Sequence, residues 1–153
     1  MTSLASSIRE QEISKTRKVF PLRDFRGVKP EHITRLEAIG IGNIDQMLAA
    51  GKTSAARHSL ADETGIPLNA ILELVKLADI SRLGAIKSVR ARLYYDAGLD
   101  TPEKFAGWDP KELQAMLVEF VRRTEFDGIA LLPKEVQNAV AAARSLPKMV
   151  EYE

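Results

Sequence analysis

Two short loops carry the residues whose types and spacing could do chemistry. The first reads Gly27-Val28-Lys29, and the second, 58 positions later, reads Ala85-Ile86-Lys87. Backbone N–H groups in a tight loop before a helix can point at a phosphate, and glycine lets that phosphate approach closely. Basic residues gather around both loops. The candidate phosphate- or partner-binding residues are Arg26, Gly27, Lys29, Arg35, Arg82, Lys87 and Arg90.

Both loops lack glycines that a phosphate-binding loop of this kind would have. The first keeps Gly27 but has Lys29 where a second glycine would sit, and the second has Ala85 and Lys87 at these two positions. A lysine or an alanine narrows the approach of a phosphate and resists a positive φ. The two lysines could contribute charge to a phosphate, or they could be solvated hairpin residues. The loss of both glycines favours a structural role for the second loop.

Residue patterns typical of catalysis or metal binding do not occur in this sequence. The chain has no cysteine, and its two histidines, His32 and His58, lack the spacing of metal ligands. No glycine-rich nucleotide-binding loop or nucleophile elbow occurs. We therefore expect no enzymatic activity, no cofactor, no metal site and no small-molecule substrate. His32 lies beside an apolar stripe and should be a partly buried helix residue.

The composition indicates a soluble globular protein with no strong electrostatic field. The 153 residues suit one domain or two very small ones, and the formal net charge of +1 gives no global attraction for a polyanion. A net charge near zero still allows a local basic patch on the surface. No apolar run approaches the roughly 20 residues that span a bilayer, and the N-terminus does not resemble a secretory signal. We expect no membrane insertion and a cytoplasmic location.

Turn residues and apolar stripes predict an all-α fold. Asn43 with Gln46 and Asp109 with Glu112 have the spacing of capping boxes, which mark helix starts. No stretch of strand length alternates apolar and polar residues between turn signals. The predicted helices cover about 30–38, 43–50, 55–63, 68–81, 88–96, 103–107, 109–123 and 134–145.

An internal repeat organises these helices. At a fixed offset of 58, Lys29 pairs with Lys87 and Gly40 pairs with Gly98. A repeat of this period indicates a structural unit used twice. We expect two helical units packed as one compact domain, with the chain divided into an N-terminal arm (1–24), a first unit (25–82), a second unit (83–147) and a tail (148–153).

The N-terminal arm mixes scattered apolar side chains with basic ones. Pro21 interrupts any helix that begins further upstream. The arm could be a partly ordered tail that packs its few apolar residues on the domain. It could also be a segment that docks on another molecule.

The first loop and the helix after it resemble the helix-hairpin-helix pattern. Gly27-Val28-Lys29 is followed by Ile33 and Leu36 at the spacing of that pattern, and 97–101 reads A-G-L-D-T. The span from Gly27 to Pro147 is similar to an uncharacterised prokaryotic family of tandem helix-hairpin-helix proteins. The resemblance implies two helix-hairpin-helix units and sequence-independent contact with a nucleic-acid backbone.

We predict a non-enzymatic interaction module, an accessory or scaffold subunit that docks on a larger protein assembly. The near-neutral charge, the degenerate loops and the apolar-plus-basic arm favour this function over polyanion binding. The alternative is sequence-independent binding of DNA or RNA backbones through the two loops. The expected partner is therefore a protein, with a nucleic acid as the alternative.

Overall fold

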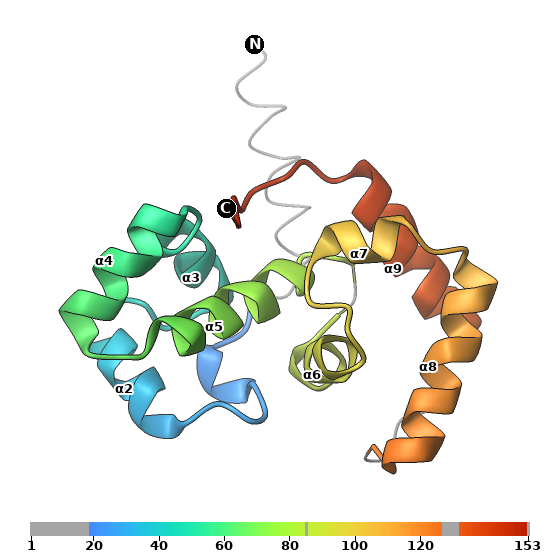
Figure 1. Ribbon diagram of the computed structural model, residues 1–153, viewed down its shortest axis with the longest axis horizontal. Coiled ribbons are helices and arrows are strands. Elements are labelled where there is room, and N and C mark those ends of the chain that lie inside the picture. Colours follow the sequence, from blue (N-terminus) through green and yellow to red (C-terminus); the bar gives the residue numbers. More distant parts are fainter. Residues whose placement is uncertain (1–18, 85, 127–131, 153) are drawn as a thin grey trace.

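The computed structural model describes residues 19–84, 86–126 and 132–152, and all regular elements within them are helical. Figure 1 shows their arrangement. The elements are a short 3-10 helix η1 (Leu22–Asp24) and the α-helices α2 (Pro30–Ala38), α3 (Ile44–Ala50), α4 (Ser54–Thr64), α5 (Leu68–Ile80), α6 (Ser88–Asp96), α7 (Pro102–Ala106), α8 (Pro110–Thr124) and α9 (Pro133–Ser145). The all-α prediction is confirmed.

Local capping chemistry sets several of the helix starts. The Asn43 side chain accepts a hydrogen bond from the Gln46 amide (2.9 Å), and the Gln46 side chain accepts one from the Asn43 amide (3.2 Å). Asp109 caps α8 by accepting from the amides of Lys111 and Glu112 (3.1 and 3.2 Å). These side chains satisfy amides that the first turn of a helix leaves without partners.

Helices α2 and α6 have the same length and end in the same way. Each has nine residues and is followed by a glycine in the left-handed region, Gly40 (φ 89°) and Gly98 (φ 97°). The next residue, Ile41 or Leu99, donates to the carbonyl five positions earlier at 2.9 or 2.8 Å. This is the hydrogen bond of a Schellman termination, for which glycine is strongly favoured.

Helix α5 lies at the centre of the molecule (Figure 1). Helices α3 and α4 pack on one part of it and α6 packs on another, while α7 and α8 pack on α9. Its second half is buried on nearly every side, because α5 carries seven buried residues, Ile71, Leu74, Val75, Leu77, Ala78, Asp79 and Ile80. A helix with such a surface must sit inside the fold rather than against one face of it.

The buried apolar side chains form one cluster that runs through both halves of the chain. Leu36 and Met47 from the first half share it with Tyr94, Phe105 and Leu117 from the second. The rings of Tyr94 and Phe105 meet edge to face, with centroids 5.1 Å apart. The helices therefore form a single compact domain around a shared core.

The ordered fold begins earlier than the predicted boundary at residue 25. Phe20 and Leu22 are part of the buried cluster. The Leu22 amide donates to the Gly42 carbonyl (2.9 Å), and the Ile44 amide donates to the Phe20 carbonyl (3.3 Å). The last part of the predicted arm thus packs on the start of α3. Residues 1–18 of the arm lie outside the described part of the chain.

The predicted C-terminal tail packs on the domain as far as it is described, to residue 152. From α9 the chain returns towards the first-half helices (Figure 1). Val150 is fully buried, and the Glu151 amide donates to the Lys52 carbonyl at 2.8 Å. The Tyr152 carbonyl accepts from the Arg57 guanidinium at 3.3 Å. We call residues 146–152 the C-terminal strap.

Candidate binding surface

The first predicted loop packs against a second-half helix. Gly27 has a φ of 77°, a conformation that side chains rarely adopt. A Cβ atom at this position would lie only 3.1 Å from the Cζ atom of Arg92 on α6. The Arg92 Nε atom donates to the Arg26 carbonyl at 2.7 Å. Glycine is therefore favoured here by the positive φ of the turn, and its lack of a side chain leaves room for the guanidinium.

Arg92 joins this loop to two helices. Besides the loop carbonyl, its guanidinium contacts Glu73 on α5 (2.7 Å) and Asp96 on α6 (3.4 Å). It also lies over the ring of Tyr95, with Cζ 5.3 Å from the ring centroid. The first loop thus serves as a joint between the two halves of the fold.

The second loop presents its lysine in the same local position as the first. Gly84 has a φ of 69° and Ile86 is buried, while Ala85 lies outside the described residues. Lys87 is the N-cap residue of α6, as Lys29 is of α2, and neither side chain caps its helix. Both lysines are exposed. Two ammonium groups therefore reach solvent from equivalent positions before α2 and α6.

Arg82 is a buried structural residue, which argues against its predicted role at a binding surface. Only 7% of the residue is exposed. Its Nε atom donates to the Asp79 carboxylate at 2.8 Å, and its Nη1 atom donates to the Pro147 carbonyl at 3.1 Å. Because these contacts tie the C-terminal strap to α5, we leave Arg82 out of the candidate surface.

The remaining arginines differ in how far they are engaged by the protein. Arg90 is half-buried and forms a two-point contact with Glu135 on α9, at 2.5 and 3.1 Å. Arg35 is exposed and lies 3.5 Å from the Thr64 carbonyl. Arg26 is also exposed. Of the candidate cations near the second loop, Lys87 is exposed, Arg90 is half-buried and Arg82 is buried.

A buried polar network connects α5 to the C-terminal strap. The Tyr152 hydroxyl donates to the Asp79 carboxylate at 2.6 Å, opposite the contact from Arg82. Burial raises the pKa of Asp79, although the hydrogen bond from Tyr152 and the charge of Arg82 oppose the shift. Burial and the neighbouring Asp79 carboxylate raise the pKa of the Tyr152 hydroxyl. The network is structural, since its polar atoms bind one another.

Helix α8 has an apolar face and one further exposed apolar residue, Val118. At 100° per residue the face spans about 140°. In order around the helix, its apolar residues are Met116, Phe120, Leu113, Leu117 and Val121, and the polar Gln114 separates them from Val118. Leu113 and Leu117 at the centre of the face are buried, while Val118 is 50% exposed. Figure 1 shows α8 at the periphery of the molecule.

A comparison with known protein families identifies the chain. Residues 26–146 match the family described as a domain of unknown function, DUF4332. The chain belongs to the DUF4332 family. No curated protein and no solved structure matches it. The match runs from the first loop to the end of α9, so one DUF4332 domain includes both halves of the fold.

Two structural features of this chain lie outside the matched DUF4332 residues. Phe20 and Leu22 precede the match, and most of the C-terminal strap follows it. The strap could not be predicted from helix signals, because the helix signals in the sequence end at Pro147. The alternation of buried Val150, exposed Glu151 and partly buried Tyr152 is the pattern of an extended segment with one face on a core. That pattern could have revealed it.

The described residues of the DUF4332 chain contain neither a metal-binding cluster nor a membrane-spanning helix. No group of three or more histidine, cysteine, aspartate or glutamate side chains could hold a metal ion in that part of the chain. None of the helices described is long and apolar enough to cross a membrane. His32 lies on α2 and is more fully buried than the partly buried position predicted, and the His58 ring makes a 2.8 Å contact with the Ser54 carbonyl.

Proposed function

We propose that this protein is a non-enzymatic interaction module that docks on a larger protein assembly through the exposed edge of α8. The observation that carries the proposal is the half-exposed Val118 beside the apolar face of this helix. Val118 is half exposed, and the adjoining Val121 is only partly buried. An apolar side chain gains stability when a partner removes it from water, and helix faces of this kind are common docking surfaces.

The state of the basic residues supports a protein partner over a polyanion. Arg82 and Arg90 bind Asp79 and Glu135, so they contribute little uncompensated charge. Sequence-independent binding to nucleic acids depends on several free cations along one surface. The formal net charge of +1 adds no general attraction. A docking surface on α8 needs none of these charges.

A charge placed at the edge of α8 tests the proposal. We expect Val118→Asp to weaken binding to a co-purifying protein at least about tenfold, because a buried carboxylate at an interface centre is unfavourable. The matched control is Ile39→Asp, which changes another exposed apolar residue, 41% exposed, beyond the end of α2. Both variants should unfold at temperatures close to that of the wild type.

The measurement is gentle purification of the tagged full chain from its native source, followed by mass spectrometry. A photo-crosslinking amino acid at position 118 should link to the same partner that Val118→Asp loses, and one at position 39 should not. A wild-type chain that purifies without a stoichiometric partner would refute the proposal. Retention of the partner by Val118→Asp would also refute it.

Sequence-independent binding to DNA or RNA is the second candidate function. The specific observation in its favour is the equivalent placement of Lys29 and Lys87 before α2 and α6. The shared helix length and Schellman termination of α2 and α6 support a repeated unit of the helix-hairpin-helix kind. Two lysine contacts with phosphates would give a salt slope of about −2.

Fluorescence anisotropy with labelled duplex DNA tests this second function. Affinity should fall about tenfold or more between 50 and 200 mM salt, and Lys29→Glu with Lys87→Glu should abolish binding. The control is Lys52→Glu with Lys111→Glu, which makes the same charge change at two other exposed lysines. Absence of binding even at 50 mM salt would exclude this function.

A further inference from the structure

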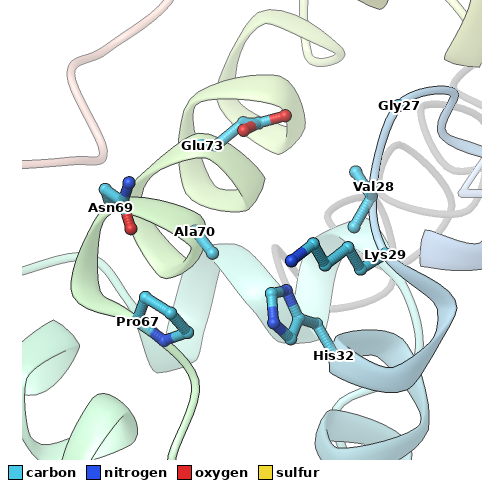
Figure 2. Close-up of a pocket in the computed structure, with 8 residues that line it drawn as sticks. All are labelled: Gly27, Val28, Lys29, His32, Pro67, Asn69, Ala70 and Glu73. Atoms are coloured by element: carbon cyan, nitrogen blue, oxygen red, sulfur yellow. The ribbon is translucent and has the colours of Figure 1, made fainter.

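A small polar pocket lies beside the first loop, away from α8. It has a volume of about 230 Å³ and lies between the start of α2 and the first turns of α5. Figure 2 shows Lys29 and His32 on one side of it, with Pro67, Asn69 and Glu73 on the other. Pockets for drug-sized molecules begin at roughly 300 Å³, so this one fits only a small ligand.

His32 is the strongest sign that the pocket is built for a ligand. Only 9% of the residue is exposed, and its imidazole faces the pocket (Figure 2). Among the described residues no side chain or backbone group forms a hydrogen bond with its ring nitrogens. The ring nitrogens are not enclosed by the protein, so a hydrogen-bonding group in the pocket can reach them.

The N-terminal end of α5 forms another part of the pocket wall. Its N-cap residue, Pro67, makes no side-chain cap, and the Ala70 and Ile71 amides bond to the Pro67 carbonyl. The amides of Leu68 and Asn69 come earlier in this 13-residue helix, and helix geometry gives them no acceptor within it. Such amides, together with the positive end of the helix dipole, attract negatively charged groups.

The charges around the pocket also favour a negatively charged ligand. Lys29 extends its side chain across the pocket next to the His32 ring (Figure 2). Glu73 is the carboxylate that lines the pocket, and its charge is balanced by Arg92, whose Nη2 atom lies 2.7 Å from Oε1. The start of α2 adds the positive end of a second helix dipole.

We propose that this pocket binds a small oxyanion, a phosphate or carboxylate group of a free molecule. The Asn69 amide at the start of α5 donates to its oxygens, His32 donates from one ring nitrogen, and Lys29 contributes an ammonium group. These are the donor types that recognise phosphates and carboxylates in proteins. The site is separate from the α8 surface, so loss of one function leaves the other measurable.

The test is an NMR titration of the ¹⁵N-labelled full chain with inorganic phosphate and, in a second arm, with acetate. We expect saturable chemical-shift changes of the Leu68 and Asn69 amides, with a Kd in the millimolar range. The changes should reach saturation at an anion concentration of about 10 mM or a few times that. Lys29→Gln should weaken the binding about tenfold, as loss of a charge-assisted hydrogen bond does. Asn69→Asp should abolish binding by adding a negative charge.

Matched controls separate this site from general attraction to lysines. Lys111→Gln removes an exposed lysine on α8 and should leave phosphate binding unchanged. Val118→Asp should also leave it unchanged, which distinguishes the pocket from the proposed docking surface. A third arm with a short single-stranded oligonucleotide identifies the source of the phosphate.

Three outcomes would overturn the proposal. The first is the absence of saturable shifts at Leu68 and Asn69 with either anion. The second is an equal effect of Lys29→Gln and Lys111→Gln, which would mean diffuse surface attraction. The third is a response of these amides to the oligonucleotide alone, which would assign the pocket to a nucleic-acid backbone instead of a free anion.

Discussion

The hydrogen bond between Tyr152 and Asp79 provides a sharp test of the role of the C-terminal strap. Tyr152→Phe removes one hydroxyl, which donates to a buried carboxylate at 2.6 Å, and keeps the ring in place. A hydrogen bond to a charged group contributes about 1.5–3 kcal/mol to stability. Since Asp79 keeps its contact with Arg82, we expect Tyr152→Phe to lower the free energy of unfolding by about 2 kcal/mol.

Urea unfolding followed by circular dichroism measures this loss. With an m-value of about 2 kcal/mol per molar, the midpoint should fall by about 1 M. The matched control is Tyr95→Phe, which deletes the hydroxyl of a partly buried tyrosine whose ring contacts Arg92. This control should cost less than about 0.5 kcal/mol, because its hydroxyl binds no group among the described residues.

A double-mutant cycle shows whether the loss comes from this hydrogen bond. Asp79→Asn replaces the charged acceptor with a neutral one, which reduces the hydrogen bond to about 0.5–1.5 kcal/mol. Tyr152→Phe should therefore cost about 1 kcal/mol less in the Asp79→Asn background. Equal costs in both backgrounds would refute the reasoning, and so would a Tyr152→Phe cost no larger than that of Tyr95→Phe.

Two further predictions concern packing and charge. Gly51→Ala places a Cβ atom 2.4 Å from Cγ2 of buried Val75, so urea unfolding should show a loss of about 1–3 kcal/mol, whereas Gly107→Ala, with open space around it, should cost less than about 0.5 kcal/mol. Burial of Asp100 is outweighed by the ammonium groups of Lys104 and Lys76, which lower its pKa. Because the pKa of Asp100 is lower in the folded protein than in the unfolded chain, where it is about 3.9, ionised Asp100 stabilises the fold at higher pH. This stabilisation is lost as the pH falls through the pKa of Asp100 in the folded protein. The advantage of the wild type over Asp100→Asn, about 1 kcal/mol near neutrality, should therefore vanish in urea unfolding between about pH 5 and pH 2. An advantage that persists at the lowest pH, or a cost of Gly107→Ala equal to that of Gly51→Ala, would contradict these interpretations.

The helices could be predicted from the sequence because their boundaries depend on local chemistry. The capping box of Asn43 and Gln46, the cap at Asp109 and the glycine after α2 each act within a few residues. The donors, acceptors and turn residue that set each boundary lie within one short stretch of the sequence. Those elements appear in the structure within about two residues of their expected bounds.

The contacts between distant segments could not be predicted in the same way. As a cation near a loop, Arg82 is a candidate for a binding surface, yet one of its two partners, the Pro147 carbonyl, lies 65 residues further along the chain. The role of Arg92 at Gly27 also depends on how the two halves meet. The pocket around His32 is formed by residues of both α2 and α5, and no local sequence motif predicts that these two helices meet there.

The return of the C-terminal strap has a consequence for how the chain folds during synthesis. Its hydrogen bonds connect Arg57 with Tyr152, Asp79 with Tyr152, and Arg82 with Pro147, across 95, 73 and 65 residues. Asp79 and the guanidinium groups of Arg57 and Arg82 lack these partners until Pro147 and Tyr152 leave the ribosome. The first helices can form early, but these polar contacts form only after the C-terminal strap has been synthesised. Contacts of such long sequence separation slow folding relative to a helical bundle with local contacts alone.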